Sequence, residues 1–283
     1  MDFDGIRTIA ITALFSDDEL FDTIVLKGGN AIRLVHGFGT RASLDLDFSM
    51  EGDFADPKLV AARIFRSLRE RFFSVGLALF DESFAPRPNT PGGCETTDWG
   101  GYRLVFKLID RQKYASLKGD IEAIRREALE VGPAHLRTFT VDFSKFEYCT
   151  GKMEAELDDY AIYVYTTSMI AVEKLRAICQ QMPAYTLRRH PQARARDFFD
   201  IHQLATKAGV RFADSENIVL LKRIFDAKRV PVELIRRIPY EREFHRHDWP
   251  SVEASVSGRL ESFDYYFDFV VDQAKELEAL GVI

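Results

Sequence analysis

The feature that most constrains this chain is a glycine pair followed by two alternating aspartates. Gly28 and Gly29 precede a segment in which Asp45 and Asp47 flank Leu46. Successive side chains of a strand point to opposite faces, so the two carboxylates share one face while Leu46 points toward the core. Like charges this close repel each other unless a cation lies between them. Mg²⁺, or Mn²⁺ in its place, suits such a face because it binds one or two carboxylates together with water and phosphate oxygens.

The glycine pair itself predicts a phosphate-binding turn. It lies between an apolar run that ends at Lys27 and a helix that we expect from Asn30 to about Val35. Glycine backbone can approach a triphosphate closely, and the first N–H groups of a helix are free to bind it. Each motif alone is common in turns and on solvated strands, whereas the combination indicates nucleotide chemistry. The predicted nucleotide-binding residues are Lys27, Gly28, Gly29, Asn30, Arg41 and Ser43.

Composition narrows the class of protein. The 283 residues allow one large domain or two modest ones, and 46% hydrophobic with 29% charged residues is ordinary for a globular chain. No stretch approaches the roughly 18 consecutive apolar residues of a membrane span, and the N-terminus does not resemble a signal peptide. The three cysteines, Cys94, Cys149 and Cys179, have neither disulfide nor zinc spacing. We therefore expect a cytoplasmic protein without a membrane partner.

Charge is distributed unevenly along the chain. The net charge is −6, yet residues 186–247 contain 14 Lys and Arg against 8 Asp and Glu. A basic region in an acidic protein suits RNA or another acidic partner. A salt-bridged helical surface has the same composition, and the sequence leaves both interpretations open.

The pattern of apolar residues predicts strands first and helices later. We expect strands at 23–26, 101–109 and 138–144, and a loop around 86–93. We also expect one or two helices over 6–21 and further helices over 57–75, 114–130 and 262–280. Beyond residue 166 the chain reads as mostly helical. Alternation in the strand at 138–144 places Asp142 on one face with Thr138 and Thr140. Asp142 is therefore a candidate third metal carboxylate, with an exposed, non-catalytic aspartate as the equal alternative.

Two later segments carry charges at helical spacing. Lys174 lies in the segment 173–177, and Asp197 and Asp200 are three residues apart in the segment 194–202, so one helix face can present both. A lysine there could neutralise phosphate oxygens as charge develops during phosphoryl transfer. Taken alone, both segments also fit ordinary charged helix surfaces.

Four segments, taken in their order along the chain, resemble the signature of the AbiEii-type nucleotidyltransferases: 26–33, 41–48, 173–177 and 196–200. Members of this family are toxins of bacterial type IV toxin–antitoxin and abortive-infection systems, and they belong to the polymerase β-like superfamily. The resemblance covers most of the chain up to about Leu204. It implies an α+β fold in which a nucleotidyltransferase domain, a small mixed sheet flanked by helices, occupies 1–155. A helical C-terminal domain would then occupy 156–283.

The resemblance also implies roles for individual residues. Asp45 and Asp47 would hold the metal and act in catalysis, Lys174 would contact the triphosphate, and Asp197 or Asp200 would complete the site. In some relatives a serine at the position of Ser43 is phosphorylated. Asn30 departs from the usual serine or threonine, although asparagine can also cap a helix.

The expected activity is transfer of a nucleoside monophosphate from an NTP to an acceptor, with the 3′ end of tRNA as one acceptor and a winged-helix antitoxin as a partner. Two alternatives remain at this point. One is a non-catalytic module that binds a nucleotide or a partner protein. The other is a transferase that acts on a protein or small-molecule hydroxyl.

Overall fold

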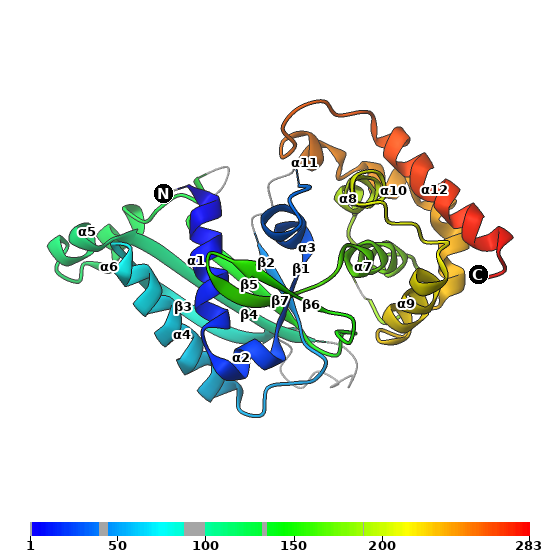
Figure 1. Cartoon of the computed structure of the whole chain (residues 1–283). Coiled ribbons are helices and arrows are strands. Elements are labelled where there is room, and N and C mark those ends of the chain that lie inside the picture. Colours follow the sequence, from blue (N-terminus) through cyan, green and yellow to red (C-terminus); the bar gives the residue numbers. More distant parts are fainter. Residues whose placement is uncertain (1, 40–44, 88–99, 132–134, 189) are drawn as a thin grey trace. The chain divides into compact units, whose positions relative to one another are not determined.

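The computed structural model describes residues 2–39, 45–87, 100–131, 135–188 and 190–283. Contacts divide the chain into two units (Figure 1): unit 1 contains Met1–Lys27, Leu44–Phe146 and Met153–Val164, and unit 2 contains Gly28–Ser43, Glu147–Lys152 and Tyr165–Ile283. The division at residues 155 and 156 stays a prediction, because a grouping of contacts does not show which segments fold as separate domains.

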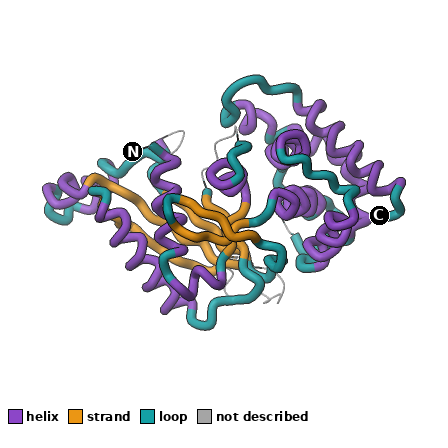
Figure 2. Tube along the Cα trace, in the orientation of Figure 1, coloured by secondary structure: helices purple, strands orange, loops and turns teal. Residues whose placement is uncertain are grey.

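Unit 1 is built on a seven-stranded mixed sheet with the order β3-β4-β5-β2-β1-β7-β6 (Figure 2). Parallel pairs join β2 to β5 and β1 to β7, and the other neighbours are antiparallel. The strands are β1 (Val25–Lys27), β2 (Leu46–Ser49), β3 (Leu77–Arg87), β4 (Gly101–Asp110), β5 (Phe139–Ser144), β6 (Met153–Leu157) and β7 (Tyr160–Val164). The short β2 therefore lies inside the sheet, between β5 and β1.

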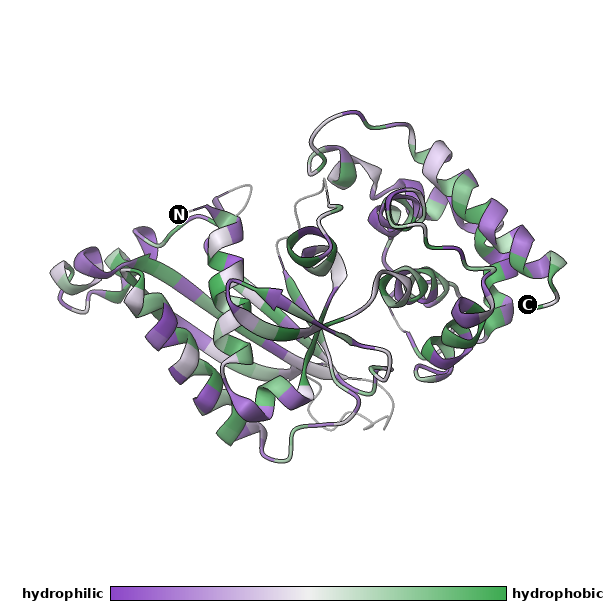
Figure 3. Cartoon of the chain, in the orientation of Figure 1, coloured by the Kyte–Doolittle hydropathy of each residue, from purple (hydrophilic) through white to green (hydrophobic). Residues whose placement is uncertain are grey.

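The helices of unit 1 are α1 (Phe3–Phe15), α2 (Asp18–Thr23), α4 (Pro57–Ser74), α5 (Arg111–Ser116) and α6 (Ile121–Arg126). The side chain of Asp56 accepts two backbone N–H groups to begin α4, and Pro57 occupies the first turn, where its missing N–H costs nothing. Four apolar residues at helical spacing, from Val60 to Phe72, bury one face of α4. Figure 3 shows the alternation of hydrophobic and hydrophilic residues around this helix. α1 packs beside it (Figure 1).

Two features of unit 1 differ from the sequence prediction. The single helix expected over 114–130 is interrupted between α5 and α6, because Lys118 and Gly119 adopt positive φ angles of 47° and 84° and the side chain of Asp120 starts a new helix. The loop expected around 86–93 begins later than predicted, because Pro86 lies in β3. Proline, which lacks an N–H, is tolerated there since β3 is an edge strand of this sheet.

Unit 2 is helical, as predicted for the later part of the chain. Its elements are α3 (Gly28–Asn30), the π-helix η1 (Ala31–Val35), α7 (Thr167–Cys179), α8 (Ala195–Lys207), α9 (Ser215–Asp226), the 3₁₀ helix η3 (Val232–Glu241), α10 (Arg242–Arg246), α11 (Trp249–Glu253) and α12 (Phe263–Ala279). α7 packs against α8 and α9, and α12 packs against α8. Phe198 of α8 stacks on Phe267 of α12 with ring centroids 5.0 Å apart, so aromatic side chains form much of this core.

The mixed sheet with flanking helices and the helical unit confirm the predicted α+β class. Within the residues that the structure describes, no helix has the length and apolar character needed to cross a bilayer. Cys149 and Cys179 are buried thiols.

Candidate active site

The predicted metal-binding aspartates lie at the start of β2 in unit 1. Leu46 and Phe48 are buried at 3% and 0% exposure, Asp47 is half-buried, and Asp45 is exposed immediately before the strand. This is the pattern expected when alternate residues of one strand face the core. Asp47 therefore lies on the opposite side of β2 from Leu46 and Phe48, and a common face for Asp45 and Asp47 stays a prediction.

Asp142 lies next to Asp47 across the sheet, because the parallel pairing of β2 and β5 places the two in register. Its carboxylate accepts two hydrogen bonds from Arg103 of β4, Nε to Oδ1 and Nη2 to Oδ2, both at 2.6 Å. The sequence reasoning missed Arg103. The signal is available only once β4 and β5 are paired, because Arg103 is then the antiparallel partner of Asp142.

Negative charge from all three aspartates acts on Arg103. The bidentate hydrogen bond from Arg103 to Asp142 raises the pKa of the guanidinium most, partial burial opposes the rise, and the charges of Asp45 and Asp47 add to it. One strong cation and three carboxylates thus share this face of unit 1. Charge of this kind attracts divalent cations as well as arginine.

The residues of this face partly suit the metal that the sequence implies. Asp47 of β2 and Asp45 immediately before the strand offer two carboxylate groups, which matches the carboxylate requirement of Mg²⁺ or Mn²⁺. The described residues contain no cluster of three or more His, Cys, Asp or Glu side chains that could hold a metal ion. Asp142 is engaged by Arg103 in this geometry. The donor set therefore fits a cation held by Asp45 and Asp47, while metal binding by Asp142 stays a prediction.

The predicted phosphate-binding turn follows β1 directly. Lys27, the last residue of β1, is buried and is the antiparallel partner of Asp47. Gly28 comes next with φ of +73°, a conformation that side-chain-bearing residues rarely adopt. The helical run already begins at Gly28, so Asn30 lies inside it. Asn30 consequently makes no side-chain cap to the π-helix, which differs from the predicted capping role.

Arg41 and Ser43, the remaining predicted nucleotide-binding residues, lie outside the described residues.

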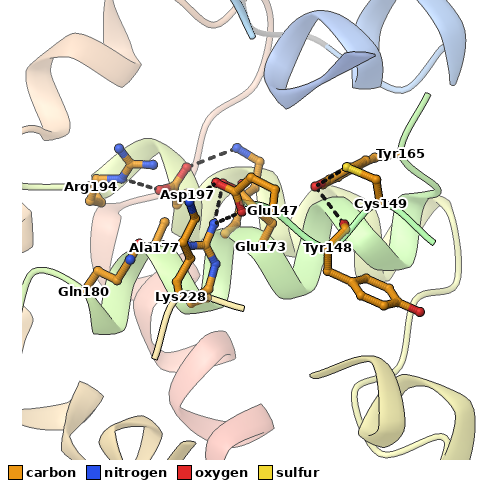
Figure 4. Close-up of polar contacts among 12 residues, drawn as sticks. Glu147, Tyr148, Cys149, Tyr165, Glu173, Ala177, Gln180, Arg194, Asp197 and Lys228 are labelled. Atoms are coloured by element: carbon orange, nitrogen blue, oxygen red, sulfur yellow. Dashed lines mark hydrogen bonds and ion pairs between the residues drawn. The ribbon is translucent and has the colours of Figure 1, made fainter. Parts of the chain in front are cut away.

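The predicted residues of unit 2 come together in a buried ionic cluster, which we call the Lys174 cluster: Lys174 of α7, Asp197 and Asp200 of α8, and Arg194. Nζ of Lys174 lies 3.0 Å from Oδ1 of Asp197 and 2.7 Å from Oδ2 of Asp200. Nε of Arg194 donates to Oδ2 of Asp197 at 2.6 Å (Figure 4). Two cations and two anions balance one another here, which is how buried charges are tolerated.

Burial distinguishes this cluster from an ordinary charged helix surface. Lys174, Asp197 and Asp200 are exposed by only 4%, 1% and 5%. Burial alone would raise the pKa of Asp197, but the positive charges of Arg194, Lys174 and Arg196 outweigh it, so the pKa lies well below its usual range. Asp197 is therefore ionised at neutral pH. The surface interpretation that the sequence allowed is excluded for these three residues.

A second buried ionic cluster in unit 2 was not predicted. Arg176 Nη2 lies 3.2 Å from Glu147, and Lys228 Nζ lies 3.4 Å from the same carboxylate (Figure 4). Tyr185 donates its hydroxyl to the backbone carbonyl of Lys228. These contacts hold Glu147–Lys152 against α7 and the end of α9. Their sequence signal is weak, because the three charged residues are far apart in the chain.

Comparison with known proteins assigns the family. The family "Nucleotidyl transferase AbiEii toxin, Type IV TA system" matches residues 9–272. The chain belongs to the AbiEii nucleotidyltransferase toxin family. This confirms the predicted family and enzyme class, and it implies an NTP substrate and an antitoxin partner for this AbiEii protein.

One solved structure resembles the AbiEii chain in fold, and a second gives a lower score. The crystal structure of a "putative nucleotidyltransferase" from H. pylori shares 15% identity, covers 98% of this chain and 96% of its own, and gives a TM-score of 0.50. An antigenic nucleotidyltransferase-like protein from Paracoccidioides brasiliensis shares 14% identity, covers 82% of this chain and 94% of its own, and gives a TM-score of 0.34. No curated protein matches the sequence.

Proposed function

We propose that this AbiEii protein is a Mg²⁺-dependent nucleotidyltransferase that transfers a nucleoside monophosphate from an NTP to an RNA hydroxyl, with the 3′ end of tRNA as the acceptor. The reaction would take place in the cytoplasm, where both substrates are abundant. The observation that carries the proposal is the face of β2, where Asp45 and Asp47 gather negative charge beside the strand that leads into Gly28.

Asp45 and Asp47 would hold the cation. When bound, the cation would polarise the α-phosphate and make the acceptor hydroxyl more acidic. The acceptor hydroxyl gives up its proton to solvent and its oxygen forms a bond to the α-phosphorus, while the bond from that phosphorus to the bridging oxygen breaks and pyrophosphate leaves. The half-buried Asp47 keeps its carboxylate oriented because both neighbours in β2 are fixed in the core.

The protein's own cations and amides would bind the triphosphate. Gly28 and Gly29 present backbone N–H groups at the start of a helical run, where anions bind favourably. Lys174 would stabilise charge on the phosphates, with Asp197 and Asp200 holding its ammonium group in place. The same proposal includes a regulatory role for Ser43 and a nucleotide-binding role for Arg41.

The basic stretch 186–247 would contribute part of the RNA contact. Several of its cations already have protein partners: Arg194, Lys228, Arg242 and Arg246 bind carboxylates. The exposed Arg211 and Arg236 also lie near carboxylates, whereas Arg196, Lys207, Lys222, Arg223 and Arg237 are further exposed cations of this stretch. Exposed cations suit phosphate contacts, whose strength falls steeply with salt concentration. The interpretation as a salt-bridged surface therefore holds for one part of this stretch, and the cations of the other part would be available to contact RNA.

A labelling experiment tests the proposal. The protein is incubated with each α-labelled NTP, Mg²⁺ and a cell extract, and the label is then sought in RNA, protein and small molecules. The proposal expects label at tRNA 3′ ends, its loss with EDTA, and its loss in Asp47→Asn. Label in protein or in a small molecule would instead support transfer to those hydroxyls. NTP binding without any transfer would support the non-catalytic module.

A further inference from the structure

His245 is a buried titratable group with no role in the function proposed so far. It lies in α10 of unit 2 and is fully buried. The centroid of its ring lies 5.1 Å from the ring centroid of Phe198 and 5.0 Å from that of Phe244. Its Nδ1 accepts the backbone N–H of Arg194 at 3.0 Å. Because Nδ1 is the acceptor, the proton of the neutral ring resides on Nε2.

The other ring nitrogen makes the presence of histidine costly. Nε2 of His245 is buried and has no hydrogen-bond partner among the described residues. A buried donor without a partner destabilises a fold, and an apolar side chain of similar size would avoid the loss. The compensating contact of the ring is the hydrogen bond that Nδ1 accepts from the backbone N–H of Arg194. That bond is therefore the feature that distinguishes histidine from leucine at this position.

Arg194 connects His245 to the Lys174 cluster. It is the residue immediately before α8, and its side chain does not cap the amides of the helix. Its carbonyl accepts the N–H of Asp197 at 2.9 Å, and its guanidinium holds the Asp197 carboxylate that Lys174 also binds. Fixing the Arg194 backbone therefore fixes the first turn of α8 and the direction of the Asp197 carboxylate.

The helix that carries His245 is itself firmly held. Arg242 and Arg246 of α10 each lie 2.7 Å from Asp264 of α12. The Arg242 guanidinium also lies 4.2 Å from the ring centroid of Phe267. Contacts of this kind give His245 a rigid support from α12.

We propose that His245 is a positioning residue for the nucleotide site: by accepting the Arg194 amide it fixes the first turn of α8 and so orients Asp197 and Lys174 for the triphosphate. The inference rests on the function proposed above, in which Lys174 serves the nucleotide. Burial lowers the pKa of His245 to about 4, so the ring is neutral and able to accept at physiological pH. Asp197 opposes this shift and Arg194 supports it.

Two substitutions separate the hydrogen bond from the packing. Asparagine can present Oδ1 near the place of Nδ1, so His245→Asn keeps an acceptor, whereas His245→Leu keeps apolar packing without one. His202→Leu is the matched control. His202 is a half-buried histidine of α8, and its ring contacts Tyr265, Tyr266 and Phe269 rather than Arg194.

Steady-state transfer kinetics give the first measurement. We expect His245→Leu to raise the KM for the NTP about tenfold, the change that about 1.4 kcal/mol of lost binding produces, with a smaller change in kcat. His245→Asn and His202→Leu should stay within about threefold of the wild type. Partial unfolding would behave differently, because it lowers the active fraction and hence kcat at constant KM. Unchanged KM in His245→Leu would overturn the proposal.

Amide hydrogen exchange gives a second measurement that needs no activity. Peptides spanning Arg194 and Asp197 should exchange faster in His245→Leu than in the wild type, and His245→Asn should restore most of the protection. Equal protection in all variants would overturn the proposed role. If the wild-type protein transfers no nucleotide, the proposed function fails, and the exchange result still decides whether His245 fixes this turn.

Discussion

Replacing Lys174 with methionine should destabilise unit 2 strongly, because the substitution removes one cation from a buried cluster. Asp197 retains Arg194 at 2.6 Å, whereas Asp200 loses the ammonium that lies 2.7 Å from its Oδ2. Removing one partner of a buried ion pair typically costs about 3–5 kcal/mol, since the other charge stays desolvated. The retained Arg194 places the expected loss for Lys174→Met near the lower end, about 3 kcal/mol.

Tryptophan fluorescence can follow this loss in unit 2 alone. Trp249 is 8% exposed and packs against Phe263 and Tyr266, and the sequence contains one other tryptophan, Trp99. In a Trp99→Phe background, denaturant unfolding at pH 7.5 therefore reports on the surroundings of Trp249. The observed midpoint and slope give the free energy of unfolding for this unit.

Two controls decide whether the reasoning is right. Lys275→Met removes an exposed pair with Asp272 in the same unit and should change the free energy of unfolding by no more than about 0.5 kcal/mol. Lys174→Met combined with Asp200→Asn should recover about half of the loss, because less uncompensated charge stays buried. A Lys174→Met protein as stable as Lys275→Met would refute the buried cluster.

Three further predictions follow from individual residues. The folded-state pKa of His245 is about 4, below the ordinary 6.5, so its contribution to stability is complete above pH 6.5 and declines as pH falls. At pH 5 the free energy of unfolding should be lower by about 2 kcal/mol in the wild type, measured through Trp249, and this loss should be absent in His245→Asn. Equal losses in both proteins would mean that His245 is not the group responsible. Arg103→Gln should tighten Mn²⁺ binding severalfold without nucleotide, measured by titration calorimetry, because it removes a cation from the aspartate face and releases Asp142; weaker binding would mean that Arg103 orders the metal ligands instead. Gly28→Ala should lower the free energy of unfolding by about 1 kcal/mol, because φ of +73° strains any residue with a Cβ; an unchanged denaturation midpoint would argue against that conformation.

The local features of unit 1 were predictable because they depend on short sequence periods. The alternation around Asp47 and Asp142 follows from strand geometry, and in the structure both side chains are half-buried between core neighbours. The amphipathic helix α4 was predicted to within a residue for the same reason. Helix boundaries that depend on single residues were harder to predict, as the break between α5 and α6 at Lys118 and Gly119 shows.

Contacts between distant segments were not predictable from local patterns. Arg103 engages Asp142 through strand pairing, and His245 meets Arg194 across 51 positions of sequence. The charge spacing of Lys174, Asp197 and Asp200 is equally compatible with a solvated surface, and only packing of α7 on α8 buries it. Family resemblance identified these residues, while the structure shows the partners that hold them.

The most direct test of the account is nucleotide transfer by Asp45→Asn and Asp47→Asn at increasing Mg²⁺ and Mn²⁺ concentrations, with unfolding measured in parallel. Both changes keep the shape of the side chain and remove the charge that would hold the cation. The account predicts that each variant folds like the wild type and loses transfer by at least about a hundredfold at every metal concentration. Wild-type transfer by a folded Asp47→Asn protein would show that the carboxylate of Asp47 does not hold the catalytic cation.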